Sequence, residues 1–129
     1  MSVTSARASL RIFPGEATAR SVTDRLSITP DDAHEAGDAN TRSGRPWAAA
    51  QWSIRSTLPD AEPPSAHLEE LLDRVEDVSP LLLQLHDEGL TMDWFCFIGR
   101  ENGQGGPSFK PDLLQRLGAL PAVLELDVY

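Results

Sequence analysis

The chain has one cysteine, Cys96, among 129 residues. A lone thiol excludes a disulfide and a cysteine-based zinc site within one chain. Long apolar runs are also missing, and no stretch approaches the roughly 20 residues that a membrane-spanning helix needs. The opening stretch contains Arg7 and Arg11 and no continuous apolar block, which predicts that it is not a signal peptide. These absences predict a cytoplasmic protein.

Basic residues are scarce, with 11 Lys and Arg against 20 Asp and Glu, for a net charge of −9. Residues 60–93 hold ten of the acids and a single basic residue, Arg74, so this segment accounts for the whole excess. A negative field of this kind repels phosphate backbones and predicts that the protein does not bind nucleic acid. It suits a basic protein partner, and the alternative is a solvated acidic helix face.

The length predicts one domain over residues 1–129, and the chain is long enough to bury a core. Alternating apolar and polar residues predict four strands, and apolar residues at helical spacing predict four helices. The predicted strands are 6–13, 48–57, 91–98 and 122–128. The predicted helices are 17–27, 65–78, 80–89 and 111–120.

The outward residues of the two terminal strands carry opposite charges. Arg7 and Arg11 lie on the first, and Glu125 and Asp127 lie on the last. Opposite charges across neighbouring strands are stabilising, so these two strands are expected to lie side by side. We therefore expect an α+β, two-layer domain with a mixed or antiparallel sheet of four to five strands and helices packed mainly on one face.

The helix expected from Ser65, its predicted cap, has an apolar stripe on one side and acids on the other. Its stripe consists of Leu68, Leu71, Leu72, Val75 and Val78. The opposite side offers a predicted partner-binding surface of Glu69, Glu70, Asp73 and Asp77. His67, in the first turn, is expected to face solvent. His86 is expected to have a structural role near the next helix's C-terminus.

The stretch TMDWFCFI, residues 91–98, is apolar on both faces of the predicted strand. Cys96 shares a parity with Trp94 and is expected in the core. Phe95 and Phe97 have the parity at which the other strands carry polar residues. Two exposed rings would give up roughly 1.5–3 kcal/mol of burial free energy each. The aperiodic segment 29–46 is the expected cover, and the alternatives are a cleft between segment and sheet or a bound partner.

The same segment 29–46 holds the densest polar cluster, and its side chains are a candidate ligand site. The cluster contains Asp31, Asp32, His34, Glu35 and Asp38. Oxygen and imidazole ligands suit a divalent cation, but the spacing matches no metal-binding loop. We therefore predict no metal and no cofactor. Trp47 is a candidate binding anchor at the end of this segment. Asp93, with the parity of Phe95, is expected to be solvated at the start of its strand.

Motifs of catalysis are missing from the sequence. No serine stands in Gly-x-Ser-x-Gly, and the glycines at 103, 105 and 106 lack the Gly-Lys-Ser/Thr ending of a phosphate-binding loop. No catalytic residue is predicted.

Four stretches of the sequence are similar to a known family. They are ASLRIF, the run from AHEAGD to QWSIRS, FCFIG with its downstream Gly105-Gly106, and the closing PDLLQRLGALPAVLELDVY. With these stretches the chain resembles the uncharacterised bacterial family called domain of unknown function 4279. The family pattern has a serine before Pro111, where this chain has Lys110, so a weaker helix cap is expected there. The resemblance implies an α+β layout and a bacterial origin, and it implies no activity, cofactor or catalytic residue.

Three functions follow as hypotheses. The leading one is a small non-catalytic cytoplasmic binding protein, in its most concrete form an immunity or antitoxin-like inhibitor of a basic protein. Its predicted contact residues are the four acids Glu69, Glu70, Asp73 and Asp77, with Phe95 and Phe97. The alternative is a small-ligand-binding protein or enzyme with a cleft under segment 29–46, lined by Asp31, His34, Asp38, Trp47 and Asp93. The third is a homodimer through the aromatic face.

Overall fold

The computed structural model describes residues 3–100 and 106–129, and in this part of the chain it contains a five-stranded sheet. The strands are β1 (Val3–Phe13), β2 (Asp32–His34), β3 (Gln51–Arg55), β4 (Thr91–Arg100) and β5 (Val123–Val128). Their order across the sheet is β2-β3-β1-β4-β5. β4 and β5 are parallel and the other neighbours are antiparallel, so the expected mixed sheet is confirmed.

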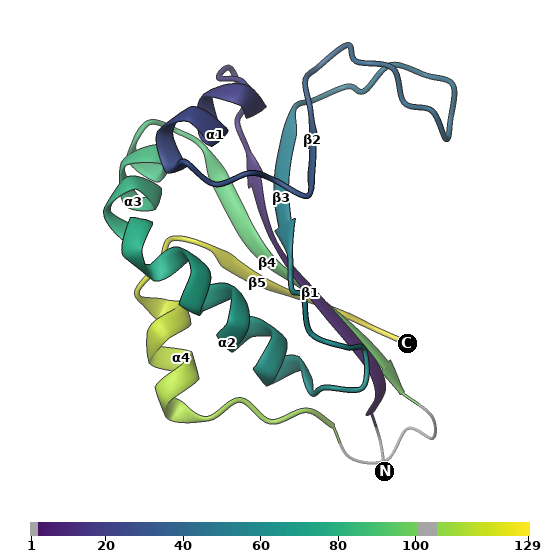
Figure 1. Ribbon diagram of the computed structural model, residues 1–129, viewed down its shortest axis with the longest axis vertical. Coiled ribbons are helices and arrows are strands. Elements are labelled where there is room, and N and C mark those ends of the chain that lie inside the picture. Colours follow the sequence, from purple (N-terminus) through teal and green to yellow (C-terminus); the bar gives the residue numbers. More distant parts are fainter. Residues whose placement is uncertain (1–2, 101–105) are drawn as a thin grey trace.

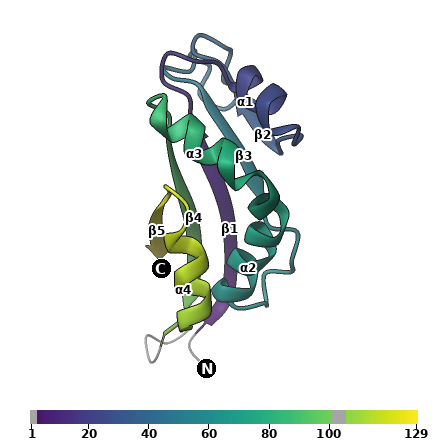
Figure 2. The same cartoon turned by 90° about the vertical axis from the view of Figure 1, so that its left-hand side faces the viewer.

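The α-helices cover one face of this sheet. They are α1 (Ala19–Leu26), α2 (Pro64–Val75), α3 (Ser79–Asp87) and α4 (Pro111–Gly118), and the 3-10 helix η1 (Glu76–Val78) joins α2 to α3. Figure 1 shows the helices to the left of the sheet, and Figure 2 shows them from the front, with the sheet behind. The two-layer α+β fold is therefore confirmed, and the second face of the sheet, which we call the open face, carries no helix of the described chain.

The core lies between these two layers and follows from the sequence pattern. The predicted stripe is confirmed for Leu68, Leu71, Leu72 and Val75, which are fully buried on α2. Its last member, Val78, lies on η1 and is partly buried against the same core. Opposite this stripe, every second residue of β1 points into the core, and the buried set is Ala6, Ala8, Leu10 and Ile12. Because strand side chains alternate between the two faces, the other half of β1 lies on the open face. No helix in the described part of the chain has the length and apolarity needed to cross a membrane.

Helix boundaries differ from the sequence predictions at the N-termini. The prediction that Ser65 caps α2 is wrong, because this helix begins at Pro64 and its N-cap is Pro63, two residues before Ser65. Proline suits the first turn of a helix because the N–H that it lacks would be unpaired there. α1 begins at Ala19 and is capped by Thr18, whose side-chain oxygen accepts from the backbone of Ser21. Lys110 precedes α4 without a side-chain cap, as expected.

The predicted pairing of the two terminal strands is wrong, because β4 lies between β1 and β5. A strand that is apolar on both faces suits an inner position, and β4 is such a strand. Arg11 is instead opposite Asp93 of β4, and Arg7 is opposite Phe97. Opposite charges therefore meet between β1 and β4, and not between β1 and β5 as the sequence predicts.

Segment 29–46 contains the short strand β2, which the aperiodic sequence did not indicate. After β2 the chain leaves the sheet as a protruding excursion, residues 35–50, which we call the arm (Figure 1). Backbone hydrogen bonds hold the arm together, from Asn40 to Arg45 and from Trp47 to Asp38. The turn expected at Asn102-Gly103 lies outside the described residues.

On the edge strand β5, the apolar side chains that alternation assigns to the core are more exposed to solvent than predicted. Leu126 and Val128, expected to face the core, are 45% and 48% exposed. The buried residues of α4 are Leu113 and Leu117, and they pack against the central core rather than over this edge.

Candidate functional site

Phe95 and Phe97 lie on the open face and are half-buried by neighbouring side chains. The guanidinium carbon of Arg11 lies 4.2 Å from the ring centroid of Phe95. That of Arg7 lies 4.9 Å from the centroid of Phe97, and the ring of Tyr129 lies 5.4 Å from Phe97 on its other side. Arginines favour the faces of aromatic rings. These side chains supply the cover that the sequence analysis assigned to segment 29–46.

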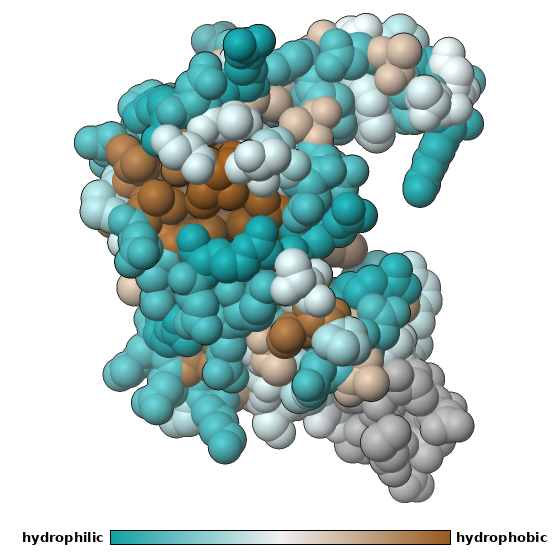
Figure 3. Space-filling view, in the orientation of Figure 1, coloured by the Kyte–Doolittle hydropathy of each residue, from teal (hydrophilic) through white to brown (hydrophobic). Residues whose placement is uncertain are grey.

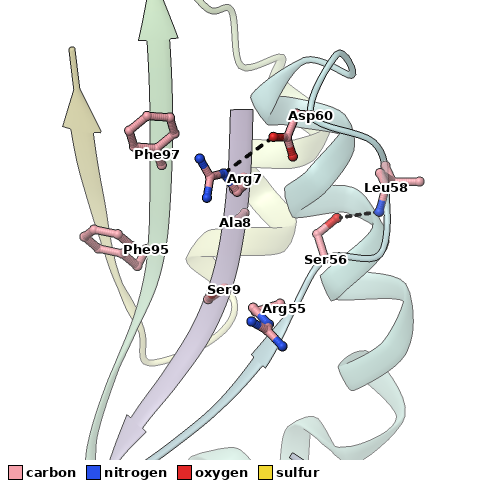
Figure 4. Close-up of a pocket in the computed structure, with 9 residues that line it drawn as sticks. All are labelled: Arg7, Ala8, Ser9, Arg55, Ser56, Leu58, Asp60, Phe95 and Phe97. Atoms are coloured by element: carbon pink, nitrogen blue, oxygen red, sulfur yellow. Dashed lines mark hydrogen bonds and ion pairs between the residues drawn. The ribbon is translucent and has the colours of Figure 1, made fainter. Parts of the chain in front are cut away.

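A hollow of about 400 Å³ opens beside the two phenylalanines, and we call it the aromatic hollow (Figure 4). It is lined by Arg7, Ala8, Ser9, Arg55, Ser56, Leu58, Asp60, Phe95 and Phe97. These residues come from β1, β3, β4 and the connection that follows β3. No residue of segment 29–46 lines it, so the prediction that this segment covers the two rings is wrong. Its strand β2 pairs with β3 at the far edge of the sheet, and both β3 and β1 lie between β2 and β4.

The two arginines of the aromatic hollow are weakly partnered. Nε of Arg7 lies 3.7 Å from Oδ2 of Asp60, and Nη1 of Arg55 lies 3.7 Å from Oδ2 of Asp32. Both distances exceed that of a hydrogen bond. The side chains of Arg7 and Arg55 are 66% and 62% exposed. Most of the surface of these two side chains is therefore in contact with solvent.

A second hollow of about 530 Å³ lies between the arm and the open face, and we call it the arm hollow. Its wall includes a stacked pair, His34 and Trp47, whose ring centroids are 3.8 Å apart at an angle of 9°. Asp38 also lines it and accepts a hydrogen bond from the backbone of Glu35. Figure 3 shows the arm standing off the body of the protein above this recess. Arg55 lines both hollows.

The predicted ligand set is therefore brought together only in part. His34, Asp38 and Trp47 meet at the arm hollow. Asp31 does not line it and instead accepts a hydrogen bond from the backbone N–H of Arg55 at 2.6 Å. Asp93 is held by Arg11, and its expected solvation is wrong, because it is buried on the inner strand β4.

The acidic surface and the aromatic face lie on opposite sides of the molecule. Glu69, Glu70 and Asp73 are on α2, and Asp77 is on η1, in the helix layer. Phe95 and Phe97 are on the open face, so one small flat surface of a partner cannot touch both predicted regions. Six of the ten acids in 60–93 form ion pairs with arginines: Asp60, Glu70, Asp73, Glu76, Glu88 and Asp93. These ion pairs therefore offset much of the negative charge that residues 60–93 carry.

Arg116 shows how this neutralisation works. Its guanidinium binds Glu76 through Nε and Nη2, at 2.9 and 2.6 Å, and reaches Asp73 at 2.7 Å. These hydrogen bonds lower the pKa of Glu76 below its ordinary value of 4.5. Of the predicted acidic surface, Glu69 and Asp77 are the members that make no ion pair with a described residue, so they carry its free charge.

Two further buried side chains bear on the sequence predictions. His67 was expected to face solvent and is fully buried, because its position on α2 continues the apolar stripe; its Nδ1 lies 2.7 Å from Oγ of Ser56. Cys96 is buried as expected, and burial raises the pKa of its thiol to about 11. No three His, Cys, Asp or Glu side chains of the described residues are grouped so that they could hold a metal ion.

Sequence reasoning missed the polar lining of the aromatic hollow, namely Arg7, Arg55, Ser56 and Asp60. The outward parity of Arg7 and Arg55 was visible, but the strand order was not: it places Arg7 opposite Phe97, and Arg55 opposite Ser9 on the other side of β1. Asp60 comes from a proline-rich connection with no periodic signal, and its backbone oxygen accepts a hydrogen bond from Ala6 at 2.8 Å.

A family model covers almost the whole chain. The model described as "Domain of unknown function (DUF4279)" matches residues 4–129, so the chain belongs to this family and the resemblance found in the sequence is confirmed. No curated protein and no solved structure was found to match the chain.

Proposed function

We propose that this chain is a non-catalytic binding protein that holds a segment of another protein on the open face of its sheet. The observation that carries the proposal is the meeting of two hollows at Arg55. Together they cross β2, β3, β1 and β4, which is a track long enough for several residues of an extended partner. Aromatic and arginine side chains dominate the energetics of protein interfaces, and the track offers Trp47, Phe95, Phe97 and the two exposed arginines.

The proposal keeps the leading hypothesis of the sequence analysis but assigns the main contact surface to the open face rather than to the acids of α2 and η1. An immunity or antitoxin-like inhibitor in a bacterial cytoplasm is one form of this function. In that form the free charges of Glu69 and Asp77 would attract a basic partner by long-range forces, while the open face makes the close contacts. The structural support is stronger for the open face, because the ion pairs of α2 leave fewer acids free.

Site-specific photo-crosslinking in lysate of the native host tests which face is used. The crosslinking residue p-benzoylphenylalanine replaces Ser9 or Gln51 on the open face, and Glu69 or Leu83 on the helix layer in matched variants. Adducts with one partner from the open-face positions are expected. Adducts from the helix layer alone, or from no position, would overturn the proposal.

The partner identified by mass spectrometry is then purified and its Kd measured with three variants. Arg55→Glu and Phe97→Ser should weaken binding at least tenfold, whereas Arg20→Gln, on the exposed side of α1, should not. Repeating the measurement with Glu69→Lys and Asp77→Lys at low and high salt tests the inhibitor form. A basic partner that binds these two variants as tightly as wild type would refute the electrostatic attraction.

A small-ligand site in the arm hollow is a second candidate, favoured by the stacking of His34 on Trp47 beside Asp38. A cavity of about 530 Å³ is within the range of ligand pockets. Thermal-shift screening of metabolites and metal ions would find a ligand. His34→Ala should then remove the shift while the unfolding temperature of the free protein stays within a few degrees. Asp38→Asn is the milder variant, because an amide oxygen can still accept the hydrogen bond of Glu35.

A further inference from the structure

We infer that the aromatic hollow is an anion-binding site, whose ligand is a carboxylate or phosphate attached to a flat apolar group. The inference deepens the proposed function and rests on it for the biological partner, which would present this group as its anchor. The chemistry itself is carried by the side chains of the hollow and can be tested with small molecules.

The two arginines of the aromatic hollow differ from the three that hold a carboxylate at two points. Arg11, Arg25 and Arg116 each donate two hydrogen bonds to one carboxylate, at 2.6–2.9 Å. Arg7 and Arg55 make only 3.7 Å contacts with their acids. A guanidinium fork matches carboxylate and phosphate geometry in a bidentate pair. Arg7 and Arg55 have no such pair with a described residue and both line the aromatic hollow, so their guanidinium groups can bind a ligand anion there.

An apolar floor lies beside these charges. Phe95 and Phe97 are neighbours on the open face of β4 and both line the hollow (Figure 4). Arg7 lies over the ring of Phe97, so an anion bound to Arg7 would bring its attached group against the phenylalanines. A volume of about 400 Å³ suits one ring with an anionic group. Charge and floor together select an aromatic acid or a phosphorylated aromatic group over a bare ion.

Asp60 is the acid that lines the same hollow. Its carboxylate is 59% exposed and contacts Arg7 at 3.7 Å, beyond hydrogen-bonding distance. A ligand anion would compete with Asp60 for Arg7. Asp60→Asn should therefore bind the ligand several-fold more tightly, because the repulsion between two anions is removed. Glu62→Gln is the matched control: it removes the same charge two residues away, outside the hollow.

Titrations followed by ¹H–¹⁵N NMR spectra test the site directly. The probes are benzoate, its neutral analogue benzamide, phenyl phosphate and inorganic phosphate. Benzoate or phenyl phosphate should shift the amide signals of residues 7–9 and 95–97, and the comparison of these two probes distinguishes a carboxylate ligand from a phosphate one. Benzamide and inorganic phosphate should each bind at least tenfold more weakly, because each lacks one half of the recognised group.

The variants decide between a built site and general charge attraction. Arg7→Gln and Arg55→Gln should each weaken binding about tenfold, while Arg20→Gln, which removes one exposed charge from α1, should leave it unchanged. The dispersion of the spectra verifies that each variant is folded. Equal binding of benzamide and benzoate, an equal effect of Arg20→Gln, or no shifts in the hollow with any probe would overturn the inference.

The two proposals fail separately. Loss of anion binding with an intact open-face crosslink would refute only the anion site. Anion binding with crosslinks restricted to the helix layer would refute only the protein-binding function.

Discussion

Arg11 and Asp93 face each other across β1 and β4 and form a two-point ion pair. Nε of Arg11 lies 2.8 Å from Oδ1 of Asp93, and Nη2 lies 2.7 Å from Oδ2. The same guanidinium lies over the ring of Phe95. These hydrogen bonds, with smaller contributions from the charges of Asp93 and Glu125, raise the pKa of Arg11 above its ordinary value. One side chain thus holds a buried carboxylate and covers an aromatic ring.

Replacing Arg11 by methionine should destabilise the protein by about 2 kcal/mol, because a buried carboxylate loses its charged hydrogen-bond donor. Urea denaturation at pH 7 measures the change. The double variant Arg11→Met with Asp93→Asn should recover part of the loss, since no buried charge remains unpaired. If the double variant loses as much as the sum of the two single ones, the coupling of this pair is refuted.

Acid should destabilise the fold partly through the pair of Arg116 and Glu76. Because Arg116 lowers the pKa of Glu76 in the folded state, the pair contributes stability above the ordinary pKa of 4.5. That contribution is lost as the pH falls through the lowered folded pKa. The drop in unfolding free energy between pH 7 and pH 3 should therefore be smaller in Arg116→Gln. Arg25→Gln should act in the same direction, since Arg25 lowers the pKa of Glu88. An unchanged drop in both variants would contradict this account.

Leu72→Ala should cost about 3 kcal/mol, because Leu72 is fully buried on α2 and its truncation leaves a cavity. Leu83→Ala makes the same chemical change on α3, where the side chain is 44% exposed. Figure 3 shows hydrophobic residues at the surface in the region of α1 and α3. This control should stay within about 1 kcal/mol of wild type. If chemical denaturation shows that both variants lose the same free energy of unfolding, the assignment of Leu72 to the core and of Leu83 to the surface is wrong.

Cys96 should react slowly with an aromatic disulfide reagent at pH 8. Burial raises the pKa of this thiol to about 11, so the reactive thiolate is rare, and the reagent cannot reach it. The rate is followed by absorbance, first in buffer and then in a denaturing concentration of urea. Unfolding should accelerate the reaction at least a hundredfold. Fast labelling in buffer would mean that β4 opens readily.

The charges of β5 should keep this edge strand from pairing with itself. In an antiparallel pair of two β5 strands centred on Leu126, Glu125 of one copy faces Asp127 of the other, and like charges directly opposite are destabilising. The double variant Glu125→Thr with Asp127→Thr should therefore dimerise at concentrations where we expect the wild-type chain, of 14.1 kDa, to sediment as a monomer. The matched variant Glu69→Thr should stay monomeric. A wild-type dimer broken by Phe97→Ser would instead support the aromatic-face homodimer.

The sequence by itself determined the position of four of the five strands and of the four α-helices, and the buried side of β1, β4 and α2. Local periodicity carries that information, and it placed Cys96 and the leucines of α2 in the core. The terminal strands carry opposite charges that are visible in the sequence, but charge alone could not select between β4 and β5 as the neighbour of β1. Strand order is a long-range property that local periodicity does not contain. The apolar residues on both faces of β4 predicted a cover by another segment, whereas they reflect the inner position of this strand in the sheet.

Only the tertiary structure decided where the candidate site lies. Arg7 comes from β1, whereas Arg55 and Asp60 come from β3 and the connection that follows it, and no spacing in the sequence links either part to Phe97. The concentrated acids of 60–93 looked like a single negative surface because their arginine partners are distant in sequence, as Arg116 is from Glu76. Folding pairs six of these acids with arginines and leaves Arg7 and Arg55 weakly partnered at the aromatic hollow, since contacts between distant segments exist only once the sheet has assembled.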